Sequence, residues 1–232
     1  MSYIILFSAI IIGVVTGEVL KKQKKIEGLF LTFSGAFLLA ITIFHLLPNV
    51  YKKGGFDIGI FIMIGIFLQI LLEYVSKGLE HAHHDNHKEN LNHTFTVPMF
   101  LSISVHAFLE GAPVHNHGHF IEDISNPILL GIFLHKIPIS SIIFISFRKS
   151  GYSKKFSVAM LALFGLMTPA GSYFVSKVPV LFQYSPQINA VVIGIFLHIS
   201  TVILFESDHG HKFNAAKLIV VASATSIVYF LF

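Results

Sequence analysis

Residues 127–147 read PILLGIFLHKIPISSIIFISF, and His135 and Lys136 are the only ionisable side chains in this apolar run. An α-helix rises about 1.5 Å per residue, so about 20 apolar residues cross the hydrocarbon core of a bilayer. Seven further runs of this kind occur along the chain, at roughly 3–20, 28–50, 57–76, 96–114, 155–175, 187–206 and 214–232. The sequence therefore predicts an all-α integral membrane protein built as a bundle of eight transmembrane helices.

The composition agrees with a membrane location. Hydrophobic residues make up 54% of the 232 residues and charged residues only 12%, about half the usual share in soluble domains. The mean hydropathy is +0.75. Eight helices leave little chain for anything else, so we expect one transmembrane domain over residues 1–232, with a histidine-rich polar loop at about 78–95. The first run lacks a basic leader and a cleavage site, so we expect it to remain as a mature helix. The chain has no cysteine, which excludes disulfides and thiolate metal sites.

The lysines and arginines predict the orientation of the bundle. Twelve of the 16 lie in the loops after the first, third, fifth and seventh runs, whereas three lie in the opposite loops and Lys136 lies inside a run. Basic loop residues gather on the cytoplasmic side of a membrane. We therefore expect those four loops in the cytoplasm and both termini outside. This placement explains the net charge of +4 without a nucleic-acid partner.

Two neighbouring runs carry the residues best suited to metal binding. His106 and Glu110 are four residues apart, so on a helix their side chains share one face, a turn apart. His135 lies near the middle of the next run, and the short connection favours antiparallel packing. We therefore expect the three side chains to converge. Ionisable groups inside a membrane are costly and usually functional. Two imidazoles and a carboxylate suit Zn²⁺ or another first-row divalent ion and leave positions open for water.

Lys136 complicates this site, because a lysine in hydrocarbon needs an anion and Glu110 is the nearest one in the predicted arrangement. In one arrangement the two pair directly, and the ammonium competes with the metal ion for the carboxylate. In the other, the ammonium stands behind the metal's ligands and takes the place of a second cation. We expect the second arrangement.

Other histidines extend the predicted path of the ion. His45, toward the outer end of the second run, is a candidate ligand at the outer mouth, and His198 lies on the seventh run. That run leads to a predicted cytoplasmic cluster, Glu206, Asp208, His209 and His211, for which ordinary polar helix-end chemistry is the alternative. Histidine clusters gather divalent ions transiently. Two loops are therefore candidate capture sites. One is predicted to be cytoplasmic and contains His81, His83, His84 and His87, with a solvated linker as the alternative interpretation. The other is predicted to be outside and contains His115, His117 and His119.

A short motif occurs three times in the predicted helices, as Gly65-Ile-Phe-Leu-Gln69, Gly131-Ile-Phe-Leu-His135 and Gly194-Ile-Phe-Leu-His198. It indicates either an internal structural repeat, as in many transporters, or the common composition of membrane helices. If it is a structural repeat, the glycines allow close approach of neighbouring helices.

Taken together, these motifs resemble the ZIP (Zrt/Irt-like) family of divalent-metal transporters over essentially the whole chain. The family's fourth-helix pattern is His-Asn-x-x-(Glu/Asp)-Gly, and this chain has His106-Ala-Phe-Leu-Glu110-Gly111. The fifth-helix pattern is His-Glu-x-Pro-x-Glu, and this chain has His135-Lys136-Ile-Pro138-Ile-Ser140. His45-Leu-Leu-Pro48 also resembles the family's second helix. The resemblance implies eight helices, both termini outside, a histidine-rich loop between the third and fourth helices, and a metal centre on the fourth and fifth.

Three departures from the family patterns change what the resemblance implies for the site. His106, Glu110 and His135 match the positions that hold the main transport metal. Ala107 and Lys136 replace an asparagine and a carboxylate of a second metal position, and Ser140 replaces a glutamate that bridges both. The resemblance thus implies a single-metal site, with Lys136 standing in for the missing cation. It also leaves weaker binding, altered selectivity or lost transport open.

We therefore expect passive or weakly coupled import of divalent transition-metal ions, most of all Zn²⁺, with no enzyme activity and no prosthetic group. The expected partners are the metal ion and the lipid bilayer, and a homodimer is left open. Two alternatives remain. An intramembrane metal-dependent hydrolase would use the same ligands to activate water, and a metal sensor would bind without transport. The short loops and the lack of cysteine favour a bacterial inner membrane.

Overall fold

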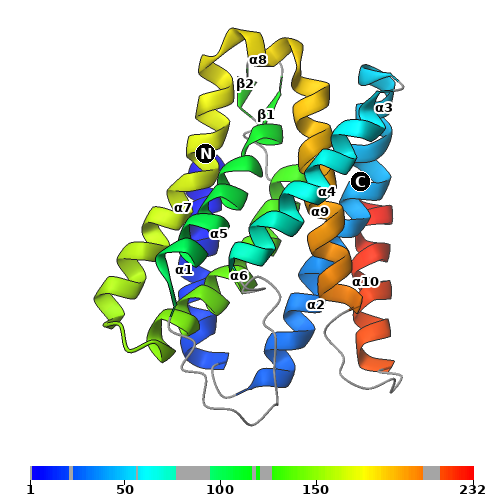
Figure 1. The fold of residues 1–232 in the computed structure, drawn as a ribbon. Coiled ribbons are helices and arrows are strands. Elements are labelled where there is room, and N and C mark those ends of the chain that lie inside the picture. The colour runs from blue at the N-terminus through cyan, green and yellow to red at the C-terminus, as the bar shows by residue number, and fades with distance from the viewer. Residues whose placement is uncertain are drawn as a thin grey trace.

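The computed structural model describes residues 2–20, 23–55, 57–76, 95–116, 119–120, 127–205 and 215–232. Almost all of them are helical, as Figure 1 shows. The helices are α1 (Ser2–Leu20), α2 (Lys24–Ile41), α3 (Leu47–Gly54), α4 (Ile58–Ser76), α5 (Val97–Leu109), α6 (Pro127–Lys149), α7 (Lys154–Lys177), α8 (Pro179–Gln183), α9 (Ser185–Phe205) and α10 (Ala215–Leu231). A π-helical turn (Thr42–Leu46) joins α2 to α3, and a 3₁₀ turn (Ala112–Val114) follows α5. The two-residue strands β1 (His115–Asn116) and β2 (His119–Phe120) pair antiparallel. The prediction of an all-helical architecture is confirmed.

Each of the eight predicted apolar runs is helical. Within the described residues, six helical segments are long and apolar enough to cross a membrane: Lys25–Gly54, Ile58–Ser76, Val97–Val114, Pro127–Lys149, Lys154–Lys177 and Ser185–Phe205. The first and last runs form shorter apolar helices, Ile4–Val19 and Ala215–Leu231. The chain is therefore a helical membrane protein. A count of eight crossings and the sides on which the termini lie stay predictions. The start of α1 and the end of α10 point toward the same end of the bundle (Figure 1).

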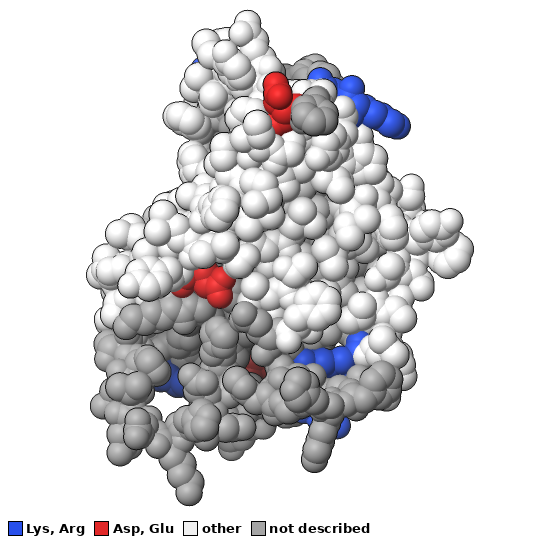
Figure 2. Space-filling model, turned by 45° about the vertical axis from the view of Figure 1, so that its right-hand side comes forward, with Lys and Arg blue, Asp and Glu red and all other residues white. Residues whose placement is uncertain are grey.

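The outer surface has the character of a lipid-facing surface. Along α4, the large apolar side chains of Ile60, Phe67 and Leu71 are each more than half exposed, at 62%, 63% and 59%. Figure 2 shows a face whose middle is nearly free of charged side chains, whereas lysines and arginines lie toward its two ends. Such a distribution suits a bundle whose middle lies in hydrocarbon and whose ends reach the interfaces.

Proline and polar caps set where several helices begin. Pro127 is the first residue of α6, where its missing N–H is lost without cost because that position has no intrahelical partner. The Ser153 side chain accepts a hydrogen bond from the backbone N–H of Phe156 at 3.2 Å and so caps α7. Just before this cap the chain turns at Gly151, whose φ of +85° favours glycine. α6 and α7 are therefore joined by a tight connection.

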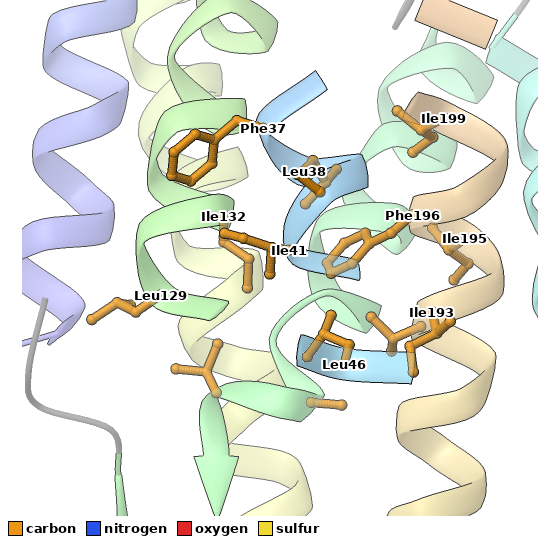
Figure 3. Packing of buried hydrophobic residues seen from close by; sticks show 14 of the residues in the cluster. Phe37, Leu38, Ile41, Leu46, Leu129, Ile132, Ile193, Ile195, Phe196 and Ile199 are labelled. Carbon is orange, nitrogen blue, oxygen red and sulfur yellow. The ribbon is translucent and has the colours of Figure 1, made fainter. Parts of the chain in front are cut away.

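The helices pack in two groups around two apolar cores. In one group α1 lies along α6, and α7 packs on both α1 and α5. In the other, α4 lies along α9 and α2 along α10. The α2 helix also contacts α6 and α9, and Figure 3 shows Ile41 of α2 between Ile132 of α6 and Phe196 of α9. These three side chains are at most 1% exposed. The two groups therefore meet at α2 and α6, and also where α4 packs on α5.

Two of the repeated glycines lie where the α4 and α9 backbones touch. A Cβ atom at Gly65 would overlap the carbonyl oxygen of Val191, and one at Gly194 would overlap that of Ile62. A larger residue at either position would have to push the two helices apart. The expectation that these glycines permit close helix approach is confirmed for this pair.

Candidate metal centre

Four ionisable side chains lie sealed inside the bundle where α5, α6 and α7 meet. His106, His135 and Lys136 are each 1% exposed, and Glu110 is 2% exposed. Glu110 is the residue that ends α5, and its backbone N–H still donates to the carbonyl of His106 at 3.0 Å. The carboxylate thus lies one helical turn beyond His106, as the four-residue spacing predicted. Sealed ionisable groups of this kind mark a functional site by default in a membrane protein.

His106, Glu110 and His135 share one neighbourhood in the structure. The His106 Nε2 atom lies 3.6 Å from Glu110 Oε2. The rings of His106 and His135 are 6.3 Å apart between centroids and nearly perpendicular, at 81°. The chain therefore brings together the two imidazoles and the carboxylate that the sequence singled out.

Lys136 differs from the expectation, because its ammonium contacts Glu110 directly. The Nζ atom pairs with Glu110 Oε1, and both side chains are almost completely buried, at 1% and 3% exposure. The direct pairing is the arrangement that we did not prefer, and a position of Lys136 behind the ligands of a bound ion stays a prediction. The physical reason is desolvation: two charges removed from water are strongly stabilised by direct contact and heavily penalised apart.

The hydroxyl of Thr168, on α7, completes this network, and the sequence analysis missed it. Lys136 Nζ donates to Thr168 Oγ1 at 2.6 Å. The same oxygen lies 2.7 Å from Glu110 Oε1 and 2.8 Å from the carbonyl oxygen of Ala107, both of which can accept its proton. A lone threonine in an apolar run carries almost no signal of such a role. Its position beside Pro169, inside α7, is the only unusual feature nearby.

Close contact between α5 and α7 brings Thr168 to Glu110. A Cβ atom at Gly111 would overlap the carbonyl oxygen of Thr168, and one at Gly171 would overlap that of Phe108. Both glycines therefore let the two backbones touch beside the charged pair. The close packing of α5 against α7 therefore explains why a glycine, Gly111, follows Glu110 in this chain.

Two further side chains border the charged network. The Lys136 ammonium lies 4.9 Å from the centre of the Phe164 ring, within the range of a cation–π interaction. Ser140, one turn after Lys136 on α6, is fully buried, and its Oγ has no hydrogen-bond partner among the described residues. It packs against Gly13 of α1, where a larger side chain on that helix would not fit.

The structure places the other two predicted ligands elsewhere. His198 Nε2 lies 2.6 Å from Glu73 Oε2, across the α4–α9 contact, with both side chains mostly buried. His45 lies in the π-helical turn, and its ring packs edge-on against Phe232 with centroids 5.9 Å apart. Glu73 was not identified from the sequence as the partner of His198. Their roles as metal ligands stay predictions.

The predicted capture residues fall mostly outside the described part of the chain. This holds for His81, His83, His84 and His87, for His117, and for the cluster that contains Glu206 and His209. His115 and His119 belong to the short strands, where His115 pairs with Phe120 and Asn116 with His119. Their backbone pairing gives no information on metal capture.

The ligand set is not assembled for metal binding in this arrangement. Among the residues that the structure describes, no three His, Cys, Asp or Glu side chains form a group that could hold a metal ion. The Lys136 ammonium contacts one oxygen of the Glu110 carboxylate, Oε1, whereas Oε2 faces His106. An ion bound through His106, Glu110 and His135 would therefore compete with the ammonium for the negative charge of Glu110.

Comparisons with known proteins add no family assignment. A scan of the chain against protein-family models gave no match, and a search of curated proteins gave no related sequence. Membership of the ZIP family therefore stays a prediction from the motifs quoted above.

Proposed function

We propose that this protein carries divalent transition-metal ions across a membrane, with Zn²⁺ as the principal cargo. His106, Glu110 and His135 bind the ion in transit. The single observation that carries the proposal is the meeting of two imidazoles and a carboxylate, each at most 2% exposed, on two consecutive apolar membrane-length segments. Such donors suit zinc and neighbouring first-row ions. The motif resemblance to the ZIP family supports the same function and the inward direction of transport.

The Lys136–Glu110 pair makes ion binding an exchange of cations in this proposal. A divalent ion and an ammonium about 5 Å apart repel by roughly 7 kcal/mol at an effective dielectric constant of about 20. The metal ion and Lys136 therefore compete for Glu110 in this proposal. When the ion binds, the ammonium moves off the carboxylate, and when the ion leaves, the ammonium returns and neutralises it. The protein thereby avoids leaving a bare buried carboxylate, which is strongly destabilising.

A metal sensor that does not transport is the second candidate, and one observation favours it. The ammonium already satisfies Glu110, and no group of three metal-binding side chains is assembled among the described residues. A protein of this kind would bind the ion weakly and show no flux. An experiment that measures both binding and flux distinguishes the two candidates.

The test is uptake of radioactive zinc into sealed proteoliposomes, with zinc binding measured in detergent on the same preparations. The informative variants are His106→Ala and Glu110→Gln, which remove one ligand each. Glu18→Gln is the matched control, because Glu18 forms a partly exposed ion pair with Lys154 at 3.2 Å, on α1 and α7, outside the candidate site.

Saturable wild-type uptake that persists in Glu18→Gln and falls at least tenfold in both site variants would support transport through this site. Zinc binding without uptake would replace the transporter with the sensor. Folded wild-type protein that neither binds nor carries zinc, cobalt, manganese or iron would overturn the proposal.

A further inference from the structure

The Thr168 hydroxyl has a geometry that suits it to hold the displaced ammonium. Its oxygen accepts from Lys136 Nζ at 2.6 Å and lies 2.8 Å from the carbonyl oxygen of Ala107. A hydroxyl has one proton to donate and lone pairs to accept with. When the proton is directed at Ala107, the lone pairs face the ammonium, and this orientation does not depend on Glu110.

Ala107 is a fixed acceptor, because its carbonyl belongs to the α5 backbone and the residue is fully buried. Thr168 is held equally firmly, since α7 touches α5 through Gly111 and Gly171. Neither atom needs to move when the Glu110 carboxylate turns toward an ion. The ammonium therefore keeps one strong acceptor after it loses Glu110.

The Phe164 ring provides the second contact for the displaced ammonium. It lies on α7 one turn before Thr168, and its centre is 4.9 Å from Lys136 Nζ. Phe164 is itself 1% exposed, so on that side the ammonium faces a buried aromatic ring. An aromatic face attracts a cation most strongly where water is excluded.

We infer that Thr168, with Phe164, is a positioning residue that retains the Lys136 ammonium while a divalent ion occupies Glu110. The inference rests on the proposed function and deepens it, because it names the groups that make the site exchangeable. Without the Thr168 oxygen, the displaced ammonium would lose this hydrogen-bond acceptor, which is costly for a buried charge. Loss of the hydroxyl should therefore weaken metal binding, even though Thr168 is not itself a ligand.

The test compares zinc dissociation constants in detergent for wild type, Thr168→Val and Thr168→Ser, each also in a Lys136→Met background. Valine keeps the shape of threonine without the hydroxyl, and serine keeps the hydroxyl. We expect Thr168→Val to weaken zinc binding about tenfold or more, the effect of one hydrogen bond to a charged group. Thr168→Ser should stay within about threefold of wild type, because it restores that acceptor. In the Lys136→Met background, Thr168→Val should have no effect, because the ammonium that it serves is gone.

Equal zinc affinity of Thr168→Val and wild type would overturn the inference. The inference would also be overturned if Thr168→Val lowered zinc affinity equally in the wild-type and Lys136→Met backgrounds, since a purely structural role does not depend on the lysine. Should Thr168→Val not fold, Thr168→Ala takes its place in both backgrounds.

Thermal unfolding without zinc of wild type, Thr168→Val, Lys136→Met and the double variant Thr168→Val/Lys136→Met separates this inference from the proposed function. A wild type that binds no zinc overturns the proposed function and the metal-dependent part of the inference. The contact between Thr168 and Lys136 is then judged by the unfolding data alone. Non-additive destabilisation by the two substitutions supports it, and additive effects refute it.

Discussion

Replacing Lys136 by methionine is the sharpest perturbation of the proposed cation exchange. Methionine has a similar length and removes the ammonium, so Glu110 is left as a buried carboxylate without its counter-charge. The two side chains are 1% and 3% exposed, so solvent screens the lost interaction very little. Breaking a buried pair by removing one partner costs about 3–5 kcal/mol of folding stability. We therefore expect Lys136→Met to lower the stability of the protein by about that amount when no metal ion is added.

The effect on metal binding should have the opposite sign. In the wild type, a divalent ion must displace the ammonium from Glu110 and then tolerate it nearby, against a repulsion of roughly 7 kcal/mol at about 5 Å. Because Thr168 and Phe164 keep the ammonium within the site, only part of this repulsion is relieved in the wild type. Its removal should strengthen zinc binding by at least about tenfold, or 1.4 kcal/mol.

The assay is thermal unfolding of the purified protein in detergent, measured over a series of zinc concentrations. A ligand at 100 times its dissociation constant stabilises the folded state by about 2.7 kcal/mol. Zinc should therefore raise the unfolding temperature of Lys136→Met more than that of wild type at every concentration. The double variant Glu110→Gln/Lys136→Met is the control, since it removes both charges and should be close to wild type in stability without responding to zinc.

Two results would refute this reasoning. One is a Lys136→Met protein as stable as wild type without metal, because the ammonium would then not neutralise Glu110. The other is unchanged or weaker zinc stabilisation in Lys136→Met, because the ammonium would then assist binding rather than compete with it.

Two further predictions concern the helix contacts that position the site and its surroundings. Gly171→Ala should lower stability by about 1–3 kcal/mol and weaken zinc binding, because the added Cβ overlaps the Phe108 carbonyl and pushes α7 from α5. The matched control is Gly28→Ala, because a Cβ atom at Gly28 meets nothing within 4 Å. This control should be neutral or slightly stabilising in the same unfolding assay. A Gly171→Ala protein indistinguishable from Gly28→Ala would contradict the close α5–α7 contact. His198→Gln should lower stability by about 1–3 kcal/mol through loss of the 2.6 Å contact with Glu73. Its zinc uptake decides whether the residue also binds the ion: an unchanged KM assigns His198 to helix packing alone, and a raised KM supports the predicted ligand role.

The helices and the first ligand pair were accessible from the sequence because local rules determine them. An apolar run of about 20 residues has few alternatives to a helix in a membrane, since every backbone polar group must be satisfied internally. The run at 127–147 accordingly lies within α6. His106 and Glu110 are related by the period of a single helix, so their proximity did not depend on any other element. His135 was expected to reach them through direct packing of the two consecutive helices. In the structure the two imidazole rings do meet, but α5 and α6 make little direct backbone contact and α7 packs on both.

The parts of the site that the sequence did not reveal depend on contacts between helices that are distant along the chain. Thr168 reaches Glu110 because Gly111 and Gly171 allow α5 and α7 to touch, and neither glycine indicates its partner from its own position. The direct contact of Lys136 with Glu110 was not the preferred expectation, for a related reason. The resemblance suggested a second cation behind the ligands, whereas the desolvation of Glu110 in a site sealed by three helices favours direct contact. Once Thr168 is included, the lysine competes with the ion without blocking it in our proposal, because the same hydroxyl that contacts the paired ammonium can retain it when Glu110 turns to the ion.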